Sequence, residues 1–302
     1  MQDPNILNEL VTVRDWIRWA VSCFNEHEVH FGQGTDNPWD EAFALVLQAI
    51  HLSPITDHNI LDTRLTLAER KKIQRWLIER VEQRRPLAYI AGQAWLAGQK
   101  FYVNEQVLIP RSPIVEWLAS YGEPWLVPDR VERILDLCTG SGSLGILAAQ
   151  AFPQANVDAI DISVEALAVA QKNVLCHGLD EQVQLIQSDV FSALTGCRYD
   201  LIISNPPYID AEEMASLPAE FKAEPTLALA AGITGLDIVA KILQQAADYL
   251  TDQGVLVVEV GNTQETVESA YPHWPFTWLE FEQGGHGVFL LTAEQCRASL
   301  NR

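Results

Sequence analysis

The chain has 302 residues, 48% of them hydrophobic, and carries a formal net charge of −20 at pH 7. This composition predicts a globular protein of one large or two smaller domains. No stretch approaches about eighteen uninterrupted apolar residues, and the amino terminus lacks a basic region followed by an apolar one. Neither a membrane span nor a secretion signal is therefore expected.

The negative charge is uneven along the chain. Residues 1–120 contain 12 Lys and Arg against 15 Asp and Glu, whereas residues 121–302 contain 8 against 25. A field of this sign repels a phosphate backbone and attracts a basic polypeptide. We therefore expect no direct binding to nucleic acid and a basic protein as partner, although solubility alone would explain the charge equally well.

The cysteines and histidines of the sequence show no pattern of a metal site or a disulfide framework. The five cysteines are scattered and form no Cys-x-x-Cys pair, and the seven histidines form no ligand set. A reduced, metal-free protein of the cytoplasm is the expectation.

The first third of the chain predicts three helices. Apolar residues recur at helical spacing over residues 5–25. Asn37 and Pro38 are a cap and a first-turn residue for a second helix, which should run to about residue 52. Thr66 and Glu69 form a capping box for a third helix, to about residue 83.

A change of pattern follows this helical region. Residues 94–96 and 100–103 are short apolar segments that predict a β-hairpin, and residues 107–109 lead into Pro110-Arg-Ser-Pro113. We expect a helical domain over residues 1–88, a hairpin linker over 89–109 and an α/β domain over 110–302.

The α/β assignment follows from apolar strands that alternate with helical segments, which is typical of a parallel sheet with crossover helices. Five strands are predicted, at residues 134–138, 157–161, 183–186, 200–204 and 254–260, with helices at 146–151 and 235–250. Residues 277–281 and 288–291 predict an antiparallel hairpin at the sheet edge.

The fourth strand ends in Asn205-Pro206-Pro207-Tyr208, which we call the hook. Two prolines prevent the strand from continuing and fix a stiff backbone that presents a polar amide and then an aromatic ring. The carboxyl end of a strand is where open α/β sheets bind ligands. A plain turn is the alternative for this tetrapeptide taken alone.

The first strand is followed by a glycine-rich loop, residues 138–145. Its spacing, Gly140-x-Gly142-x-x-Gly145, suits a dinucleotide or S-adenosylmethionine. Asp161 ends the second strand, where a carboxylate can accept both ribose hydroxyls of either cofactor.

Two further carboxylates favour S-adenosylmethionine. Asp136 lies in an apolar strand, where its burial is costly unless it finds a donor such as the ammonium group of a methionine moiety. Asp189 and Val190 suit the amino group and the face of an adenine. A backbone-capping role for Asp136 and a turn role for Asp189 are the alternatives.

These motifs together resemble the seven-stranded S-adenosylmethionine-dependent methyltransferases of amino groups. The order of a helical domain, a hairpin, Ile109-Pro-Arg-Ser-Pro113 and this core is similar to the protein-glutamine methyltransferases. Residues 34–42 and 110–114 resemble the branch that acts on the third protein of the large ribosomal subunit. One departure is Cys138, where many relatives carry glycine.

The resemblance implies a Rossmann-like seven-stranded core, S-adenosylmethionine as methyl donor with S-adenosylhomocysteine as product, and a helical domain that selects the substrate. It implies that Asn205, Pro206, Pro207 and Tyr208 act on the glutamine amide. The residues expected to bind the cofactor are Asp136, Cys138, Thr139, Gly140, Ser141, Gly142, Asp161, Ile162, Asp189, Val190 and Asn205.

Two loop residues are weaker candidates for substrate contact. Arg111 could meet the substrate backbone or a carboxylate, and Glu224 could help to cover the site. A structural ion pair is the alternative for Arg111, and a plain loop acid is the alternative for Glu224.

Other functions stay open on sequence alone. The branch that acts on peptide release factors usually has a different run where this chain has residues 110–116. The hook also suits methylation of adenine amino groups in nucleic acid, against which the charge argues. A non-catalytic ribosome-assembly factor and a nicotinamide oxidoreductase are the remaining alternatives.

Overall fold

The computed structural model describes residues 5–53, 58–282 and 284–300. The chain divides into two compact units, each treated by itself. Unit 1 comprises Met1–Trp95, Val103–Glu105 and Pro218–Ala223, and unit 2 comprises Leu96–Tyr102, Gln106–Leu217 and Glu224–Arg302. Residues 218–223 thus cluster with unit 1, although they follow the hook in sequence.

Unit 1 is helical. Its helices are α1 (Ile6–Glu9), α2 (Val13–Glu26), α3 (Pro38–Ala49), α4 (Leu67–Glu82) and α5 (Leu87–Ala91), with a 3-10 turn at His58–Asp62. The caps predicted at Asn37 and Thr66 are confirmed. The single helix expected over residues 5–25 is wrong, because Thr12 caps α2 in a capping box with Asp15 and so separates it from α1.

The core of unit 1 is formed where α2, α3 and α4 pack together. Trp16, Phe24, Leu45 and Ile73 are fully buried within it. The indole nitrogen of Trp16 donates to the carbonyl of Leu10 at 2.9 Å, so this ring is buried without leaving its donor unpaired.

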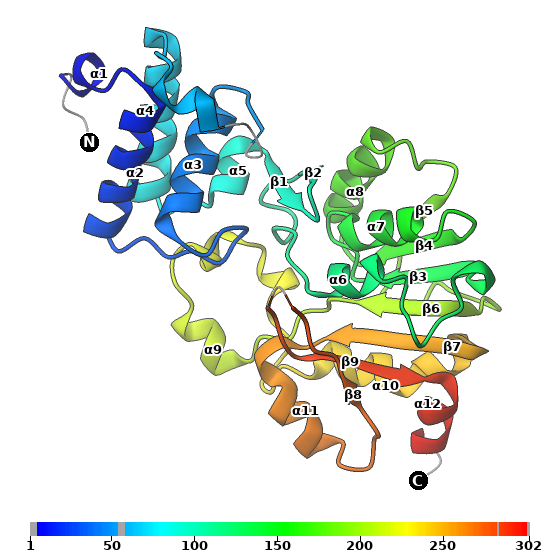
Figure 1. Cartoon of the computed structure of the whole chain (residues 1–302). Helices are drawn as coiled ribbons and strands as arrows, with labels where there is room; N and C mark the ends of the chain where they lie inside the picture. Colours follow the sequence, from blue (N-terminus) through cyan, green and yellow to red (C-terminus); the bar gives the residue numbers. More distant parts are fainter. Residues whose placement is uncertain (1–4, 54–57, 283, 301–302) are drawn as a thin grey trace. The chain divides into compact units, whose positions relative to one another are not determined.

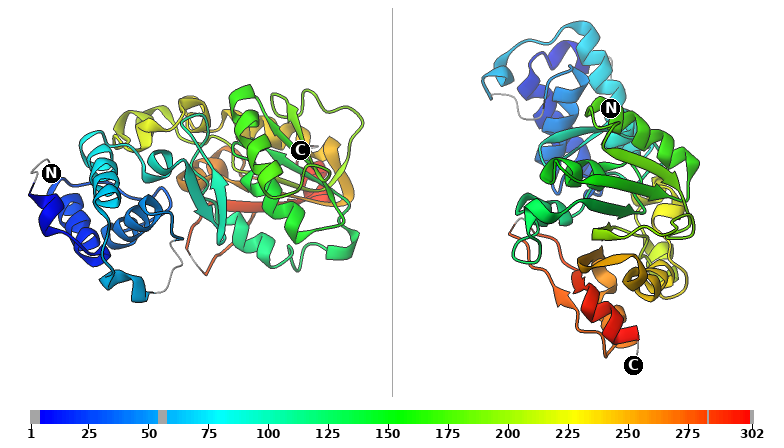
Figure 2. Two further views of the ribbon diagram at one scale, coloured as in Figure 1. Left: turned by 90° about the horizontal axis from the view of Figure 1, so that it is seen from above. Right: turned by 90° about the vertical axis from the view of Figure 1, so that its right-hand side faces the viewer.

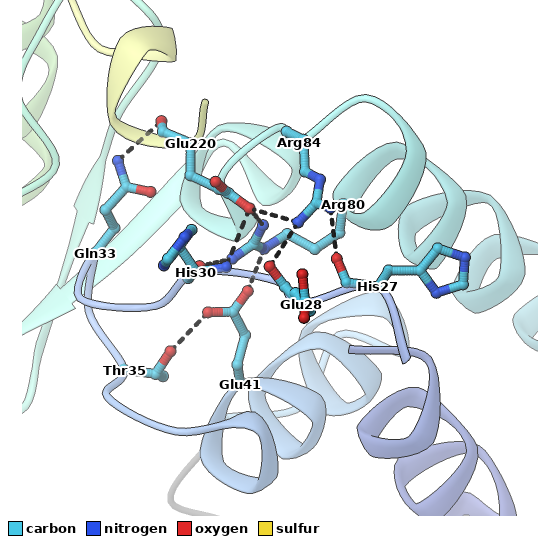
Figure 3. A network of polar contacts seen from close by, with 9 residues as sticks. All are labelled: His27, Glu28, His30, Gln33, Thr35, Glu41, Arg80, Arg84 and Glu220. Atoms are coloured by element: carbon cyan, nitrogen blue, oxygen red, sulfur yellow. Dashed lines mark hydrogen bonds and ion pairs between the residues drawn. The ribbon is translucent and has the colours of Figure 1, made fainter. Parts of the chain in front are cut away.

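A buried ion-pair network joins α3, α4 and the 218–223 segment inside unit 1 (Figure 3). Arg80 of α4 contacts Glu41 of α3 and lies 3.5 Å from Glu220. Arg84 lies 3.1 Å from the same Glu220 oxygen. The predicted α4 pattern gave no sign of this buried arginine, because its partners lie far along the chain.

Strands β1 (Gln93–Leu96) and β2 (Gln99–Tyr102) form the expected two-stranded hairpin. The main sheet of unit 2 has seven strands in the order β5-β4-β3-β6-β7-β9-β8 (Figure 1). The strands β3 to β7 run parallel, and β9 is antiparallel to both β7 and β8. Their bounds are β3 (Arg133–Leu137), β4 (Asn156–Asp161), β5 (Val183–Gln187), β6 (Tyr199–Ser204), β7 (Leu250–Glu259), β8 (Thr277–Trp278) and β9 (Val288–Thr292).

Helices cover both faces of this sheet (Figure 2). Because side chains alternate along a strand, Ile134 of β3 joins the core under one group of helices, whereas Leu135 joins the core under the other. The first group is α6 (Ile114–Ala119), α7 (Ser143–Ala151) and α8 (Val164–Cys176), and the second is α10 (Asp237–Tyr249), α11 (Gln264–Ala270) and α12 (Ala293–Leu300). Burial on both sides explains the nearly continuous apolar runs of these strands.

The predicted fold class, an α/β core with a seven-stranded Rossmann-like sheet, is confirmed by this strand order. The remaining short elements of unit 2 are α9 (Ala211–Ser216) and the 3-10 turns at Pro128–Arg130, Thr226–Ala228 and Gly261–Thr263. No helix within residues 5–53, 58–282 and 284–300 is long and apolar enough to cross a membrane.

Candidate active site

The sheet order creates a natural binding position in unit 2. From β3 the chain continues to β4 and β5 on one side, whereas β6 and β7 lie on the other side of β3. The strand order therefore reverses between β3 and β6, and ligands of open α/β sheets bind beyond the carboxyl ends of strands at such a point.

A cavity of about 400 Å³ lies at this position. It is lined by residues that follow β3, β4, β5 and β6, by the 106–112 segment and by residues 225–241. The lining residues are Gln106, Val107, Leu108, Pro110, Arg111, Ser112, Cys138, Thr139, Gly140, Ser141, Ser143, Leu144, Ile160, Asp161, Ile162, Ser163, Glu165, Ala166, Ser188, Asp189, Val190, Asn205, Pro207, Pro225, Leu227, Ala228, Ala230, Ile238 and Lys241.

The glycine-rich loop bends sharply between β3 and α7. Gly142 has a φ of 81°, and a Cβ there would lie 3.1 Å from the Cβ of Ala170, so this position requires glycine. Cys138 has a φ of 59°, in the left-handed region that favours glycine. The backbone at Cys138 is therefore strained, and glycine would adopt this conformation without strain.

Asp136 is completely buried behind this loop and does not line the cavity. Its Oδ2 accepts hydrogen bonds from the Thr139 hydroxyl and, at 2.8 Å, from the Gly145 N–H. Burial raises the pKa of this carboxyl to about 7, against the opposing effect of these two bonds. The backbone-capping geometry is thus present, and the expected role toward an ammonium group stays a prediction.

Asp161 is the last residue of β4 and Ile162 follows it, and both line the cavity. The two Asp161 oxygens accept hydrogen bonds from the N–H groups of Gly140 and Ser163, both at 2.9 Å. Burial raises the pKa of Asp161, while these bonds act in the opposite direction. Each carboxylate oxygen has a second lone pair, so both can still accept from ribose hydroxyls.

Asp189 and Val190 follow β5 and also line the cavity. Val190 has a φ of 49°, which is strained for a β-branched residue and is a feature that clusters at ligand-binding positions. Asp189 forms an ion pair with Lys241 of α10, at 2.9 and 3.0 Å from its two oxygens.

The hook follows directly after β6, which ends at Ser204. Asn205 and Pro207 line the cavity, whereas Pro206 is buried and Tyr208 lies outside the lining. The Nδ2 group of Asn205 donates to the carbonyl of Arg111 at 3.3 Å. Its Oδ1 is buried and has no hydrogen-bond partner among the residues that the structure describes. The Asn205 amide is therefore oriented by the bond of its Nδ2 group, and its Oδ1 is an acceptor that the described residues leave unused.

Comparison with known proteins identifies the family. Residues 124–232 match the family model described as "Methyltransferase small domain". The ribosomal protein uL3 glutamine methyltransferase of Francisella tularensis is 46% identical over 295 residues, which cover 97% of this chain and 94% of that protein. The protein of the same description from Bordetella pertussis is 47% identical over 296 residues, which cover 98% of this chain and 99% of that protein. The chain belongs to this methyltransferase family.

The family predicted from the motifs is thereby confirmed, since uL3 is the third protein of the large subunit. A solved structure, the catalytic domain of hMettl16 in complex with MAT2A 3′UTR hairpin 6, is similar with a TM-score of 0.51 at 16% identity. The likeness covers 74% of this chain and 81% of that chain. At this identity it supports the methyltransferase fold alone.

The residues of this family member fit S-adenosylmethionine. Two buried acceptors here, Asp136 Oδ1 and Asn205 Oδ1, lack a partner within the described parts of the chain. Such atoms are costly unless a ligand supplies donors, and this cofactor and an amide substrate both carry them. Among the described residues, no group of three His, Cys, Asp or Glu side chains is placed to hold a metal ion.

The two weaker candidates form a pair. Arg111 lines the cavity and lies 2.9 Å from Glu224, which is buried and does not line it. Glu224 also accepts from the N–H of Ile109 at 3.0 Å. The structural ion pair considered for Arg111 is therefore present, and Glu224 fixes the 109–113 loop.

Two residues near the site, Lys241 and Glu259, were not predicted from the sequence. Lys241 gave no signal, because a lysine on a helix is most simply solvated. Glu259 ends β7 and is 6% exposed, and it accepts hydrogen bonds from the hydroxyls of Ser112 and Tyr208. A carboxylate within the apolar run 255–260 was a usable signal, of the same kind that singled out Asp136.

Proposed function

We propose that this chain transfers a methyl group from S-adenosylmethionine to the side-chain amide nitrogen of a glutamine in ribosomal protein uL3. Two relatives that are 46% and 47% identical over nearly the whole chain carry that description. The structural observation that carries the proposal concerns Asn205, which lines the cavity and whose buried Oδ1 has no hydrogen-bond partner among the described residues.

An amide nitrogen is a poor nucleophile because its lone pair is delocalised into the carbonyl. In this proposal, acceptors in fixed positions compensate for the poor nucleophilicity of the amide nitrogen. The bond from Asn205 Nδ2 to the Arg111 carbonyl leaves Oδ1 free to accept one hydrogen of the substrate –NH2 group. Acceptors that are already oriented favour the positive charge that grows on nitrogen during attack.

The other three residues of the hook, Pro206, Pro207 and Tyr208, also contribute to binding of the substrate amide. In this proposal the carbonyl of Pro206 accepts the second hydrogen of the –NH2 group, and Pro207 shapes the cavity wall. Tyr208 is only partly buried, so its ring has a surface available to stack on the amide plane. Holding the nitrogen in a productive position is a large part of such catalysis. The proton leaves to water after attack.

The cofactor would be held by the strand ends. When bound, S-adenosylmethionine supplies a methyl group activated by a positively charged sulfur, and S-adenosylhomocysteine remains after transfer. Asp161 would accept from the ribose, and Ile162, Asp189 and Val190 would surround the adenine. The loop residues Cys138, Thr139, Gly140, Ser141 and Gly142, with Asp136 behind them, would receive the methionine part.

A basic ribosomal protein is a suitable partner for this negatively charged chain. A net charge of −20 attracts a basic protein and disfavours a nucleic-acid backbone. Because the proposed substrate is a ribosomal protein, we also propose that the reaction takes place in the cytoplasm. The helical residues of unit 1 are the proposed selectors of the substrate.

The deciding experiment uses purified uL3 and methyl-labelled S-adenosylmethionine. We expect one methyl on one glutamine of uL3, located by mass spectrometry, and loss of that methyl from ribosomes of cells that lack this chain. A peptide release factor and an adenine-containing RNA serve as competing substrates. Methylation of either of these in preference to uL3 would contradict the proposal.

Asp161→Ala is expected to weaken binding of S-adenosylhomocysteine by about tenfold or more, since a hydrogen bond to a charged group contributes about 1.5–3 kcal/mol. Isothermal titration calorimetry measures the change. Glu165→Ala is the matched control, because Glu165 also lines the cavity but lies in the first turn of α8 with its side chain bonded to Ser163. Equal affinities of the two variants would exclude the ribose role of Asp161.

A further inference from the structure

Glu259 is a buried carboxylate that the proposed reaction does not use. It lies at the carboxyl end of β7, is 6% exposed and does not line the cavity. Its Oε2 accepts from the Ser112 hydroxyl at 2.5 Å, and its Oε1 accepts from the Tyr208 hydroxyl at 3.3 Å. It therefore bridges the 109–113 loop and the hook.

The ring of Tyr208 is held closely on another side as well. A Cβ at Gly261 would lie 2.8 Å from Cε2 and 2.9 Å from Cζ of the ring, so the ring packs directly against this glycine. With Gly261 behind the ring and Glu259 at its hydroxyl, the plane of the phenol has little freedom. A fixed plane is what stacking on a substrate amide requires.

The same loop holds both functional ends of the hook. The Arg111 carbonyl accepts from Asn205 Nδ2 at 3.3 Å, and the next residue, Ser112, donates to Glu259. The loop itself is fixed by Glu224, which binds Arg111 and the Ile109 N–H. The 109–113 loop therefore orients Asn205 directly and Tyr208 through Glu259.

We propose that Glu259 is a positioning residue, which fixes the ring of Tyr208 and ties the hook to the 109–113 loop through Ser112. This inference rests on the proposed function, in which Tyr208 stacks on the substrate amide. Glu259 acts through Tyr208 and does not itself touch the amide.

The protonation of Glu259 should be observable at the hydroxyl of Tyr208. Burial raises the pKa of Glu259 to about 7, while the bonds from Ser112 and Tyr208 and the charge of Arg111 act against the rise. Tyr208 has a pKa raised by its own burial and by Glu259 and Glu213, so its hydroxyl stays a donor at neutral pH. The environment of the Tyr208 hydroxyl should consequently change with a midpoint near pH 7.

Two variants of Glu259 test the proposal in the full-length protein. Glu259→Met has a side chain of similar length but accepts no hydrogen bond of this strength, and we expect kcat for glutamine methylation to fall about 10- to 30-fold. Glu259→Gln can still accept from one hydroxyl and donate to the other, so it should restore most of kcat. Affinity for S-adenosylhomocysteine should stay within about twofold in both.

Asp158→Met is the matched control. Asp158 is also buried and also accepts from a tyrosine hydroxyl, that of Tyr199 at 2.7 Å, but neither residue lines the cavity. We expect its kcat to stay within about twofold of the wild type. A kcat of Glu259→Met as high as that of Asp158→Met, or a Glu259→Gln variant no better than Glu259→Met, would overturn the proposal.

A second measurement does not depend on activity. With ¹³Cζ-labelled tyrosine, the resonance that disappears in Tyr208→Phe should shift with pH around 7 in the wild type and stay constant in Glu259→Gln. A resonance that titrates equally in both proteins would overturn the positioning role. If the wild type methylates no glutamine but this titration is as expected, the proposed function fails and the contact between Glu259 and Tyr208 stands.

Discussion

Replacing Asn205 with alanine is expected to lower the rate of glutamine methylation at least about a hundredfold, with binding of S-adenosylhomocysteine almost unchanged. A preorganised polar contact to a group that gains charge in the transition state contributes about 3–4 kcal/mol. Asn205 Oδ1 is prepared for such a contact, because its own Nδ2 is bonded to the Arg111 carbonyl and Oδ1 has no partner in the described structure.

The measurement is a single-turnover assay with radiolabelled methyl donor and uL3, combined with calorimetry of cofactor binding. Asn262→Ala is the matched control, since Asn262 is an exposed asparagine outside the cavity lining. We expect the control to methylate uL3 at the wild-type rate. A rate for Asn205→Ala within threefold of this control would show that the hook does not hold the amide.

Much of the fold followed from local patterns. Each of the five parallel strands was predicted within a few residues, because strands buried on both faces leave continuous apolar runs along the sequence. The break between α1 and α2 was missed, since the apolar spacing continues across it and the Thr12–Asp15 capping box decides the boundary. The joining of residues 218–223 to unit 1 depends on Glu220, whose arginine partners lie 136 and 140 residues away.

The candidate site was predictable to the same degree. Asp161, Asp189 and Asn205, which lie at or just after strand ends, all line the cavity, because parallel strands bring their carboxyl ends to one edge. Pro206, Gly142 and Asp136 were also expected at the site, but they do not line the cavity, and Asp136 lies within β3 itself. Glu259 and Ser112 are 147 residues apart, and no local pattern connects them.

The buried network of unit 1 supports the second prediction of large effect. Figure 3 shows its members Arg80, Glu41 and Glu220 side by side. These residues are 1%, 4% and 1% exposed. Arg80 also donates to the His30 carbonyl at 2.6 Å, and Glu41 accepts from the Thr35 hydroxyl at 2.7 Å. Removing one partner from such a set leaves an uncompensated buried charge, which costs about 3–5 kcal/mol.

Arg80→Met is therefore expected to destabilise unit 1 by about 3–5 kcal/mol, chiefly because Glu41 loses its cation. Glu220 keeps Arg84 at 3.1 Å and is affected less. Hydrogen–deuterium exchange of α2 and α4 measures this change separately from the unfolding of unit 2. As a control, Arg14→Met breaks an ion pair whose members are 59% and 79% exposed, and it should leave the exchange of α2 and α4 unchanged.

The double variant Arg80→Met with Glu41→Leu separates an unpaired charge from lost packing. If the unpaired carboxylate of Glu41 causes the loss, removing it should make the double variant more stable than Arg80→Met alone. A double variant less stable than Arg80→Met would instead assign the loss to packing of the arginine side chain.

The pH dependence of the stability of unit 1 is a separate test, which concerns Glu220. Burial alone would raise the pKa of Glu220, but its hydrogen bonds and the two arginines hold this pKa below the ordinary 4.5. The contribution of Glu220 to stability is thus present above about pH 4.5 and is lost as the pH falls through the lower pKa of the folded state.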